Sequence, residues 1–196
     1  MSMTLLSPAG FQRLPINHIG YTVANLEQAI EGWTRTYGAG PFYVLSEMPF
    51  DELEFMGEPF EWNHVAAYGN CGPIGVELQT FEFPTPIPEL EKRLGGPHHL
   101  NHICYLSDDT TAESARLEAL GYPMFLYGRM GDDRFYWHDV PHLGHSIELH
   151  ATVPAITGFI QCADRMARGW DGSDPIRHEL PPGFTDAMGT LVRGSS

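Results

Sequence analysis

Positive charge is scarce in this sequence. It holds 11 lysines and arginines, of which Lys92 is the one lysine, against 25 aspartates and glutamates, and its formal net charge is −14. Nucleic-acid binding needs clustered cations that neutralise phosphates, so no nucleic-acid partner is expected. A strongly anionic substrate would depend on a few arginines, such as Arg129 and Arg134. A neutral or mildly acidic organic molecule is easier to accommodate.

Cysteines and long apolar runs are also scarce. The three cysteines, Cys71, Cys104 and Cys162, are odd in number and lack the spacing of a metal knuckle or a redox motif, so free thiols are expected. No run approaches the roughly 18 apolar residues of a membrane span. The first residues do not combine a basic segment with an apolar one, as a signal peptide does. We therefore expect a cytoplasmic protein with no membrane partner.

The sequence contains an internal repeat. Asn-His-Ile-x-Tyr occurs at 17–21 and again at 101–105, and each copy starts a segment that ends in a small residue, a β-branched residue and Glu-Leu. The first segment ends with Glu77 and Leu78, and the second with Glu148 and Leu149. A repeat of this length indicates that two similar structural units follow one another along the chain.

Each unit is predicted to fold as β-α-β-β-β. Alternating and helical patterns of apolar residues distinguish the strands from the helices. In the second unit Thr110 and Glu113 form an expected capping box, and the acidic stretch 48–59 of the first unit is expected to be an exposed loop. The fold class is therefore α+β, with two modules in a cupped mixed sheet and a C-terminal helix. The expected boundaries are 14–84 for the first module, 85–97 for a linker, 98–152 for the second module and 153–196 for the C-terminal helix and tail.

The repeat predicts a metal site. Each module has one histidine in its first strand, His18 or His102, and one glutamate in its last strand, Glu77 or Glu148. If the first and last strands of a module are neighbours, alternation along the strands lets the histidine and the glutamate converge on one face. Imidazole nitrogen and carboxylate oxygen suit one divalent ion such as Zn, Ni, Co, Fe or Mn. Taken alone, each histidine could instead be a hydrogen-bonded residue of the core, and each glutamate could be an exposed residue of the surface.

The third strands supply candidate pocket residues. Alternation places Trp62 with His64 in the first module, and Tyr136 with His138 in the second. Either histidine could relay a proton near neutral pH. Ordinary sheet packing for the aromatic residues and a structural hydrogen bond for the histidines are the alternatives. We predict that these four residues line a substrate pocket.

Residues 14–152 resemble the vicinal oxygen chelate superfamily, which includes glyoxalase I, methylmalonyl-CoA epimerase, bleomycin-resistance proteins and extradiol dioxygenases. The resemblance lies in the repeated Asn-His-Ile-x-Tyr and Glu-Leu motifs, and it implies two β-α-β-β-β modules around a metal site. His18, Glu77, His102 and Glu148 fall on the family's four metal positions. This set is similar to that of bacterial glyoxalase I, whereas the epimerases usually carry glutamine at the position of Glu77. The stretches 33–43 and 169–175 are similar to a broad group of glyoxalase-like bacterial proteins.

The resemblance implies a metal-dependent isomerase, epimerase or lyase. The metal would chelate two vicinal oxygens of a small-molecule substrate, and a carboxylate would move a proton at the adjacent carbon. Glu148 is the preferred base, and Glu77 is its symmetry-related partner. The alternatives are an extradiol-type ring-cleavage dioxygenase, which uses two histidines and one carboxylate, and a non-catalytic binding protein of the same fold. A homodimer is expected, and the modules could pair within one chain or across the dimer.

Overall fold

The computed structural model describes residues 15–46, 48–94, 96 and 99–181. Four helices and eleven strands form in these residues. The first half of the chain contains β1 (His18–Thr22), α1 (Leu26–Tyr37), β2 (Phe42–Leu45), β3 (Glu52–Phe55), β4 (Glu58–Pro59), β5 (Asn63–Cys71), β6 (Ile74–Glu82) and α2 (Pro88–Arg93). The second half contains β7 (His99–Ser107), α3 (Thr110–Ala119), β8 (Met124–Met130), β9 (Asp133–His138), β10 (Ser146–Ala151), α4 (Pro154–Ala167) and β11 (Ile176–Arg177).

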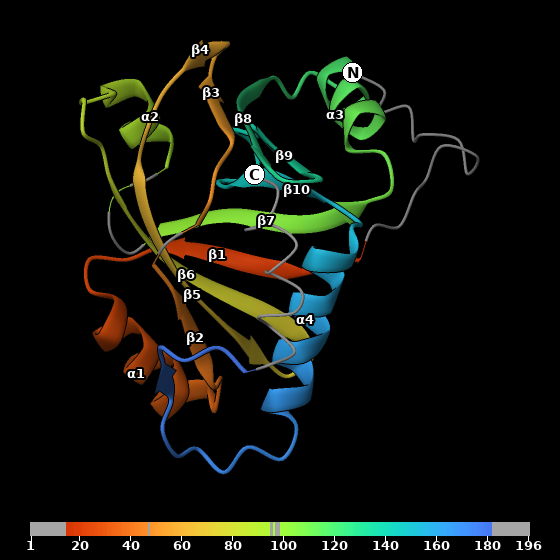
Figure 1. The fold of residues 1–196 in the computed structure, drawn as a ribbon. Coiled ribbons are helices and arrows are strands. Elements are labelled where there is room, and N and C mark those ends of the chain that lie inside the picture. The colour runs from red at the N-terminus through yellow and green to blue at the C-terminus, as the bar shows by residue number, and fades with distance from the viewer. Residues whose placement is uncertain (1–14, 47, 95, 97–98, 182–196) are drawn as a thin grey trace, which may run out of the picture.

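A single mixed sheet runs through both halves, in the order β11-β2-β5-β6-β1-β7-β10-β9-β8-β3-β4 (Figure 1). In each half the first strand lies parallel to the last one, β1 beside β6 and β7 beside β10. The two halves meet through an antiparallel pairing of β1 with β7. The predicted α+β fold of two repeated modules in a mixed sheet is therefore confirmed, and the modules pair within one chain.

Side-chain alternation assigns the two faces of the sheet. Val76 and Leu78 of β6 are fully buried in a cluster with Ile30 of α1. Leu149 of β10 packs with Leu117 of α3 in the same manner. The helices α1 and α3 therefore cover one face of the sheet. Neighbouring strand residues point to opposite faces, so Glu77 and Glu148, which are next to these apolar residues, point to the other face. Figure 1 shows α1 beside the first half of the sheet and α3 beside the second.

Local capping defines where the helices begin and end. At the start of α1, the Asn25 side chain accepts from the backbone N–H of Gln28, and Gly38 ends the helix in the left-handed region at φ 66°. At the start of α3 the cap is Asp109, whose carboxylate accepts from the N–H of Ala112. The prediction that Thr110 caps this helix is wrong by one residue, because the carboxylate before it fills that role. No helix among the described residues is both long and apolar enough to cross a membrane.

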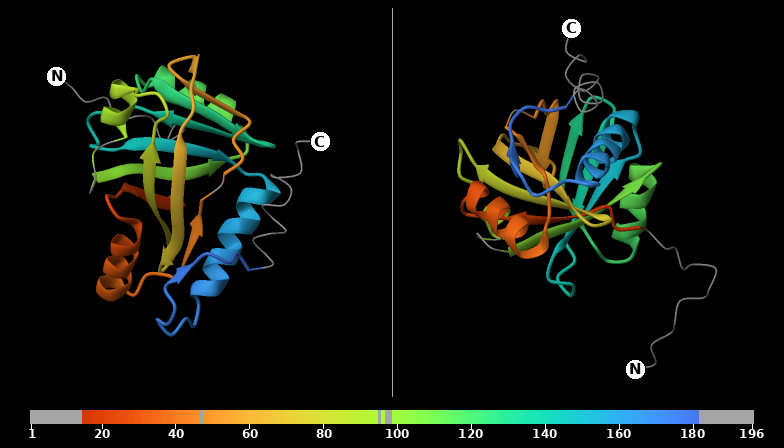
Figure 2. Two further views of the ribbon diagram at one scale, coloured as in Figure 1. Left: turned by 60° about the vertical axis from the view of Figure 1, so that its left-hand side comes forward. Right: turned by 90° about the horizontal axis from the view of Figure 1, so that it is seen from below.

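The expected loop at 48–59 instead contains the β3–β4 hairpin. β3 pairs antiparallel with β8, so a segment of the first module extends the sheet of the second (Figure 2). The sequence pattern of the first module predicts its third strand at 60–68, and β5 lies three residues later at both ends. In the expected C-terminal tail, β11 pairs with β2, and residues 182–196 lie outside the described part.

Candidate metal centre

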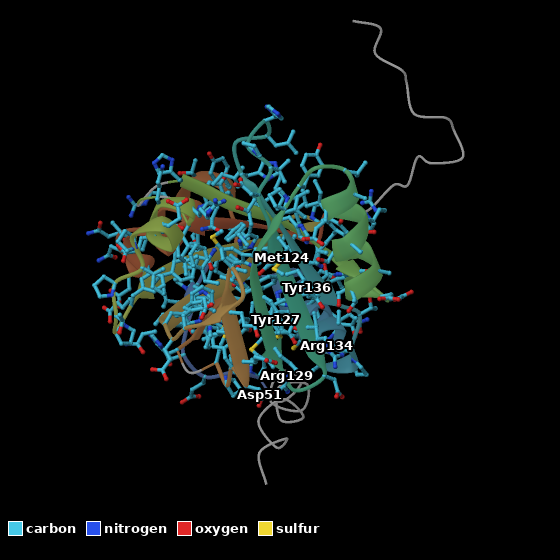
Figure 3. The ribbon with its side chains drawn as sticks, turned by 90° about the horizontal axis from the view of Figure 1, so that it is seen from above. Asp51, Met124, Tyr127, Arg129, Arg134 and Tyr136 are labelled. Atoms are coloured by element: carbon cyan, nitrogen blue, oxygen red, sulfur yellow. The ribbon has the colours of Figure 1, made fainter. Side chains whose placement is uncertain are left out.

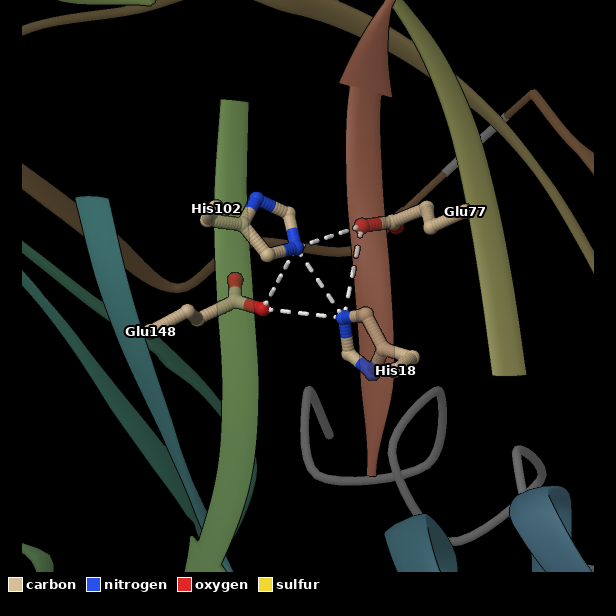
Figure 4. A group of neighbouring side chains, drawn as sticks. All are labelled: His18, Glu77, His102 and Glu148. Atoms are coloured by element: carbon tan, nitrogen blue, oxygen red, sulfur yellow. Dashed lines mark hydrogen bonds and ion pairs between the residues drawn. The ribbon is translucent and has the colours of Figure 1, made fainter. Parts of the chain in front are cut away.

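Four side chains from the two modules converge where β1 meets β7. His18 Nε2 lies 3.0 Å from His102 Nε2 and 3.1 Å from Glu148 Oε2 (Figure 4). His102 Nε2 lies 3.1 Å from Glu148 Oε2 and 3.2 Å from Glu77 Oε2. The remaining histidine–carboxylate pair, His18 Nε2 and Glu77 Oε2, is 3.6 Å apart. The structure thus brings together all four residues that the repeat singles out.

These separations fit four donors that share one ion. Donors about 2.1 Å from a metal lie roughly 3.0 Å apart at a right angle and roughly 3.4 Å apart at a tetrahedral angle. One donor atom from each of the four residues lies within 4.8 Å of every other. Three of the residues are buried, and Glu77 is 15% exposed. The geometry is that of a compact cation site closed on most sides by protein.

Asn101 fixes the tautomer of His102. The Nδ2 of Asn101 donates to the backbone carbonyl of Leu94 at 2.6 Å and to Thr22 Oγ1 at 2.9 Å. A carbonyl can only accept, so the other amide atom of Asn101, Oδ1, faces the imidazole. His102 Nδ1 lies 3.0 Å from that oxygen and donates to it. The lone pair of His102 is therefore on Nε2, the atom that points into the cluster.

Asn17 has the same function for His18. Its Oδ1 accepts from His18 Nδ1 at 2.9 Å and from the hydroxyl of Tyr68 at 3.4 Å. His18 Nε2 therefore also presents a lone pair. Two lone pairs that face each other at 3.0 Å repel unless a cation lies near both. Hydrogen bonds of this kind orient metal-binding histidines in known metal sites.

The surroundings of His18 favour a cation. Burial alone would lower the pKa of His18, because it disfavours the charged form. The neighbouring Cys104, Glu148 and Glu77 nevertheless raise the pKa of His18 well above its ordinary value. Protons and metal ions compete for the same lone pair, and both are attracted by these groups.

The two carboxylates are held differently. Glu148 Oε1 accepts from Trp137 Nε1 at 2.6 Å and lies 3.3 Å from His150 Nε2, which leaves Oε2 for the cluster. Burial would raise the pKa of Glu148, but His102, His150 and His18 lower it well below its usual range. Among the described residues, the polar contacts of Glu77 are those with His18 and His102. Glu148 is thus fixed at both oxygens, and Glu77 is fixed at one.

His150 is anchored in turn by Asp133. His150 Nδ1 lies 2.6 Å from Asp133 Oδ2, and the second oxygen of Asp133 accepts from the N–H of Ala151 at 2.9 Å. The His150 ring stacks on Phe135, with ring centroids 5.3 Å apart. Burial would lower the pKa of His150, but Asp133 and Glu148 raise it well above its ordinary value. A buried chain of acid, imidazole and acid therefore supports Glu148.

A glycine provides the space for His102. Gly20 lies opposite His102 in the β1–β7 pairing, and a Cβ on Gly20 would meet the His102 ring at 2.2 Å. His18 lies opposite Cys104 in the same pairing. The fourth residue of the repeat thus differs between the copies, glycine in the first and cysteine in the second. The two histidines therefore have unlike neighbours although the backbone pairing is the same.

A cavity opens onto three of the four residues, His18, Glu77 and Glu148, and leaves His102 buried behind them. Trp62 and His64 line it, as predicted from the sequence, together with Glu77 and Glu148. Most of its wall is apolar or aromatic. The other lining residues are Asn17, His18, Leu45, Met48, Phe50, Tyr68, Leu106, Met130, Phe135, Trp137, His150, Ile156, Phe159 and Ile160.

Tyr136 and His138 do not line this cavity and lie on the opposite face of β9. The Tyr136 hydroxyl bonds with Thr111 of α3 at 3.1 Å, and Figure 3 shows Tyr136 on the outer side of the sheet. His138 Nδ1 donates to the carbonyl of Tyr122 at 2.8 Å. The predicted placement is wrong because Trp137 pairs directly with Glu148 in the register of β9 and β10. Directly paired residues share a face, so Phe135 and Trp137 point inward.

Several site residues were missed in the sequence. Asn17 and Asn101 stand in the repeat itself, directly before each histidine, and this repetition was a usable signal. Gln79 lies on the same face as Glu77, and its amide contacts His64 at 2.9 Å. Trp137 carried no comparable signal, because only the strand register distinguishes it from its neighbours.

The chain is similar to one known family and to several solved structures. Residues 17–136 match the family described as the glyoxalase/bleomycin resistance protein/dioxygenase superfamily. Three solved structures that each cover 72% of the chain are similar to it. They are a methylmalonyl-CoA epimerase bound to methylmalonyl-CoA (19% identity, TM-score 0.43, 96% of that chain), the epimerase from Mycobacterium tuberculosis (18%, 0.44, 90%) and a hypothetical protein from Bacillus halodurans (14%, 0.46, 96%).

No curated protein matches the chain. The family match spans more than half of the sequence and includes His18, Glu77 and His102. It also covers most of the two repeated modules that the fold displays. The chain belongs to the glyoxalase/bleomycin resistance protein/dioxygenase superfamily, also called the vicinal oxygen chelate superfamily.

Proposed function

We propose that this protein is a divalent-metal-dependent enzyme that moves a proton next to two vicinal oxygens of a small organic substrate, as an isomerase, epimerase or lyase. The observation that carries the proposal is the convergence of His18, Glu77, His102 and Glu148, with both imidazole lone pairs directed inward. Two nitrogen and two oxygen donors suit Zn, Ni, Co, Fe or Mn. When bound, the ion supplies a Lewis acid that holds the substrate oxygens and stabilises negative charge on them.

Glu77 is the better candidate for the mobile base. A carboxylate that both binds a metal and takes a proton must leave the metal during the reaction. Trp137 and His150 hold Glu148 in place through its Oε1. Glu77 is free of such restraints among the described residues and is the more exposed of the two. We therefore reverse the preference drawn from the sequence and assign proton transfer to Glu77 and metal retention to Glu148.

The ring-cleavage alternative is less well supported by the geometry. Extradiol-type chemistry uses two histidines and one carboxylate and leaves other metal positions open. Here Glu77 Oε2 lies within 3.2 Å of His102 Nε2, at the distance of a fourth donor. No feature of the described residues favours the oxygenase or a purely binding role over proton transfer.

Metal analysis of purified protein tests the site. We expect about one divalent ion per chain in the parent and a loss of at least about 100-fold in affinity in His18→Ala, which removes one of the four donors. His142→Ala is a matched control, because His142 is exposed and outside the cluster. Equal metal content in the parent and in His18→Ala would disprove the site.

Proton exchange tests the chemistry. In heavy water, an α-hydroxy ketone or a 2-oxo compound is expected to gain deuterium at the carbon next to its oxygens in the presence of the metal-loaded parent. Glu77→Gln is expected to lose this exchange and to keep most of the metal. Glu148→Gln is expected to lose the exchange because it loses the metal. Oxygen consumption with a catechol would favour the dioxygenase, and a ligand returned without exchange would favour a binding protein.

The assembly and the location are separate proposals. We propose that the protein is cytoplasmic and forms a homodimer in which each chain contains both expected modules, 14–84 and 98–152. Sedimentation velocity tests the dimer, and a single species at the mass of one chain, 21.9 kDa, would contradict it.

A further inference from the structure

We propose that helix α4 is the substrate-selecting wall of the metal centre, and that it selects a substrate whose two oxygens are attached to an uncharged apolar group. The same wall excludes a substrate that is attached to a phosphate-bearing or peptide carrier. The metal-binding oxygens rest on the proposed function. The apolar group rests on α4 and on the cavity, and it is tested separately.

Helix α4 lies outside the repeated modules but packs against both. It follows β10, the last strand of the second module, and it lies beyond the family match, which ends at residue 136. In its first turn, Ala155 is buried in one cluster with Trp137 of β9. Phe159, one turn later, is buried in another cluster with Tyr68 of β5. The helix therefore extends along the sheet from the second half to the first, as Figure 1 shows.

One face of α4 lines the cavity. Ile156, Phe159 and Ile160 are spaced three and four residues apart, so they lie on the same side of the helix, and all three border the cavity. The charged residues Asp164 and Arg165 of the helix do not border it. The helix, which the structure describes from end to end, therefore presents only apolar side chains to the cavity.

This wall stands next to the metal cluster. The Phe159 ring packs edge-on against Tyr68, with ring centroids 4.9 Å apart, and the Tyr68 ring packs edge-on against His18, with centroids 5.5 Å apart. All three residues line the same cavity. One ring, that of Tyr68, thus separates the wall from a metal-binding histidine. A group attached to oxygens that are bound at the metal is therefore within reach of α4.

The positive charge that an anionic substrate needs is missing from the cavity. No lysine or arginine lines it in the described part of the chain. Arg129 is paired with Asp51 at 2.9 Å and with Glu52 at 3.5 Å. Arg134 shares the outer face of β9 with Tyr136, and both are labelled there in Figure 3. The two arginines that the sequence suggested for an anionic substrate thus lie outside the cavity.

A charged tail on the substrate is unfavourable in these surroundings. A charged group that is buried without a partner in an apolar cavity loses its hydration and gains no compensating contact. Met48, Phe50 and Trp62 line both the cavity and a neighbouring groove, whose other lining residues include the acids Asp51, Glu52, Glu54 and Glu61. An anionic tail that left the cavity through this groove would meet carboxylates. A carrier such as CoA or glutathione is therefore disfavoured on both sides of this boundary.

Calorimetric titration with three matched probes tests the proposal. Hydroxyacetone carries the two oxygens without a tail, hydroxymethyl butyl ketone adds three methylene groups, and the third probe is the butyl ketone with a sulfonate in place of its terminal methyl group. A buried methylene contributes about fourfold in affinity. After the cost of ordering the chain, we expect the metal-loaded parent to bind the butyl ketone at least about tenfold more tightly than hydroxyacetone.

The sulfonate should bind at least about tenfold more weakly than the butyl ketone, because its charge would be buried without a partner. Equal affinities for the three probes would overturn the proposal. Tighter binding of the sulfonate than of the butyl ketone would overturn it as well.

A charge placed on α4 assigns the effect to this helix. Ile156→Lys puts a cation into the cavity wall and should lower the preference for the butyl ketone over the sulfonate at least about tenfold. Gln161→Lys is the matched control, because it adds the same charge at an exposed position of the same helix, where solvent and salt screen it. Equal shifts in the two variants would overturn the role of α4.

Ile156→Ala is a milder change that keeps the helix uncharged at this position. It should weaken binding of the butyl ketone about threefold or more, because it removes apolar contact, and it should leave binding of hydroxyacetone unchanged. An unchanged affinity for the butyl ketone would contradict the role of Ile156 in the wall.

Metal titration of the same samples separates this proposal from the proposed function. If the parent binds metal and the three probes bind alike, the wall is wrong and the metal site stands. If the parent binds no metal but still prefers the butyl ketone to hydroxyacetone, the wall stands and the proposed function fails.

Discussion

Replacing Gly20 with alanine is expected to abolish metal binding through one added methyl group. In the structure a Cβ at this position would lie 2.2 Å, 2.4 Å and 2.6 Å from three atoms of the His102 imidazole. Carbon and nitrogen atoms in ordinary contact are about 3.5 Å apart, so the ring must retreat by roughly 1.3 Å. Metal sites tolerate displacements of about 0.2 Å in a ligand. His102 would therefore be lost as a donor.

The magnitude follows from the role of His102. Loss of a group that only supports a ligand typically costs 10-fold to 100-fold in metal affinity. Loss of one of four donors should cost at least about 100-fold, or about 2.7 kcal/mol at 25 °C. Overpacking in the buried strand pair should also lower the free energy of unfolding by about 1–3 kcal/mol.

Isothermal titration with Zn and with Ni measures the affinity, and urea denaturation without metal measures the stability. Gly32→Ala is the matched control, because Gly32 lies in α1 with nothing within 4 Å of an added Cβ. It should leave metal affinity unchanged and raise stability by about 0.5–1 kcal/mol. If Gly20→Ala binds metal as the parent does, the inferred position of the His102 ring is wrong.

Three further predictions concern the supports of the site and the fold. Asn101→Ala removes the acceptor for His102 Nδ1 and should weaken metal binding about 10-fold to 100-fold by calorimetry; an unchanged affinity would show that the tautomer is fixed in another way. Leu149→Ala empties a fully buried position and should cost about 2–5 kcal/mol in urea denaturation, so a loss below about 1 kcal/mol would contradict the packing. Burial lowers the pKa of His138 below 6.5, so the unfolded chain binds this proton at a higher pH than the folded one, and this residue by itself contributes a fall in stability as the pH drops from about 7 to 5. His138→Gln should remove part of that slope, and an identical slope in both proteins would rule out His138 as its source.

The metal cluster was predictable because it depends on short-range rules. Strand alternation and the repeated Asn-His and Glu-Leu motifs are enough to place His18 with Glu77 and His102 with Glu148. The condition attached to that prediction was that the first and last strands of each module are neighbours, and the sheet order meets it. The helix ends were nearly as predictable from the sequence, since helix caps are formed by local hydrogen bonds.

The errors arose where long-range pairing decides. Alternation shows that Tyr136 and His138 share one face of β9, but both faces carry aromatic residues, and only the register with Glu148 makes Trp137 the inward residue. The sequence predicts a loop where the β3–β4 hairpin forms, because β8, the strand that pairs with β3, lies about 75 residues further along the chain. The choice between Glu148 and Glu77 as base is still a prediction, and the restraint of Glu148 by Trp137 and His150, on which the present proposal depends, is visible only in the structure.

The antiparallel seam between β1 and β7 has a further consequence. Each module brings one imidazole and one carboxylate, so neither module offers all four donors by itself. A chain cut within 85–97 would yield two polypeptides, each with half of the donors. Reassociation of these fragments should then depend on metal concentration, because the ion binds the joined form, with four donors, more tightly than either fragment. Tight metal binding therefore requires that the two halves pair through β1 and β7 in the correct register.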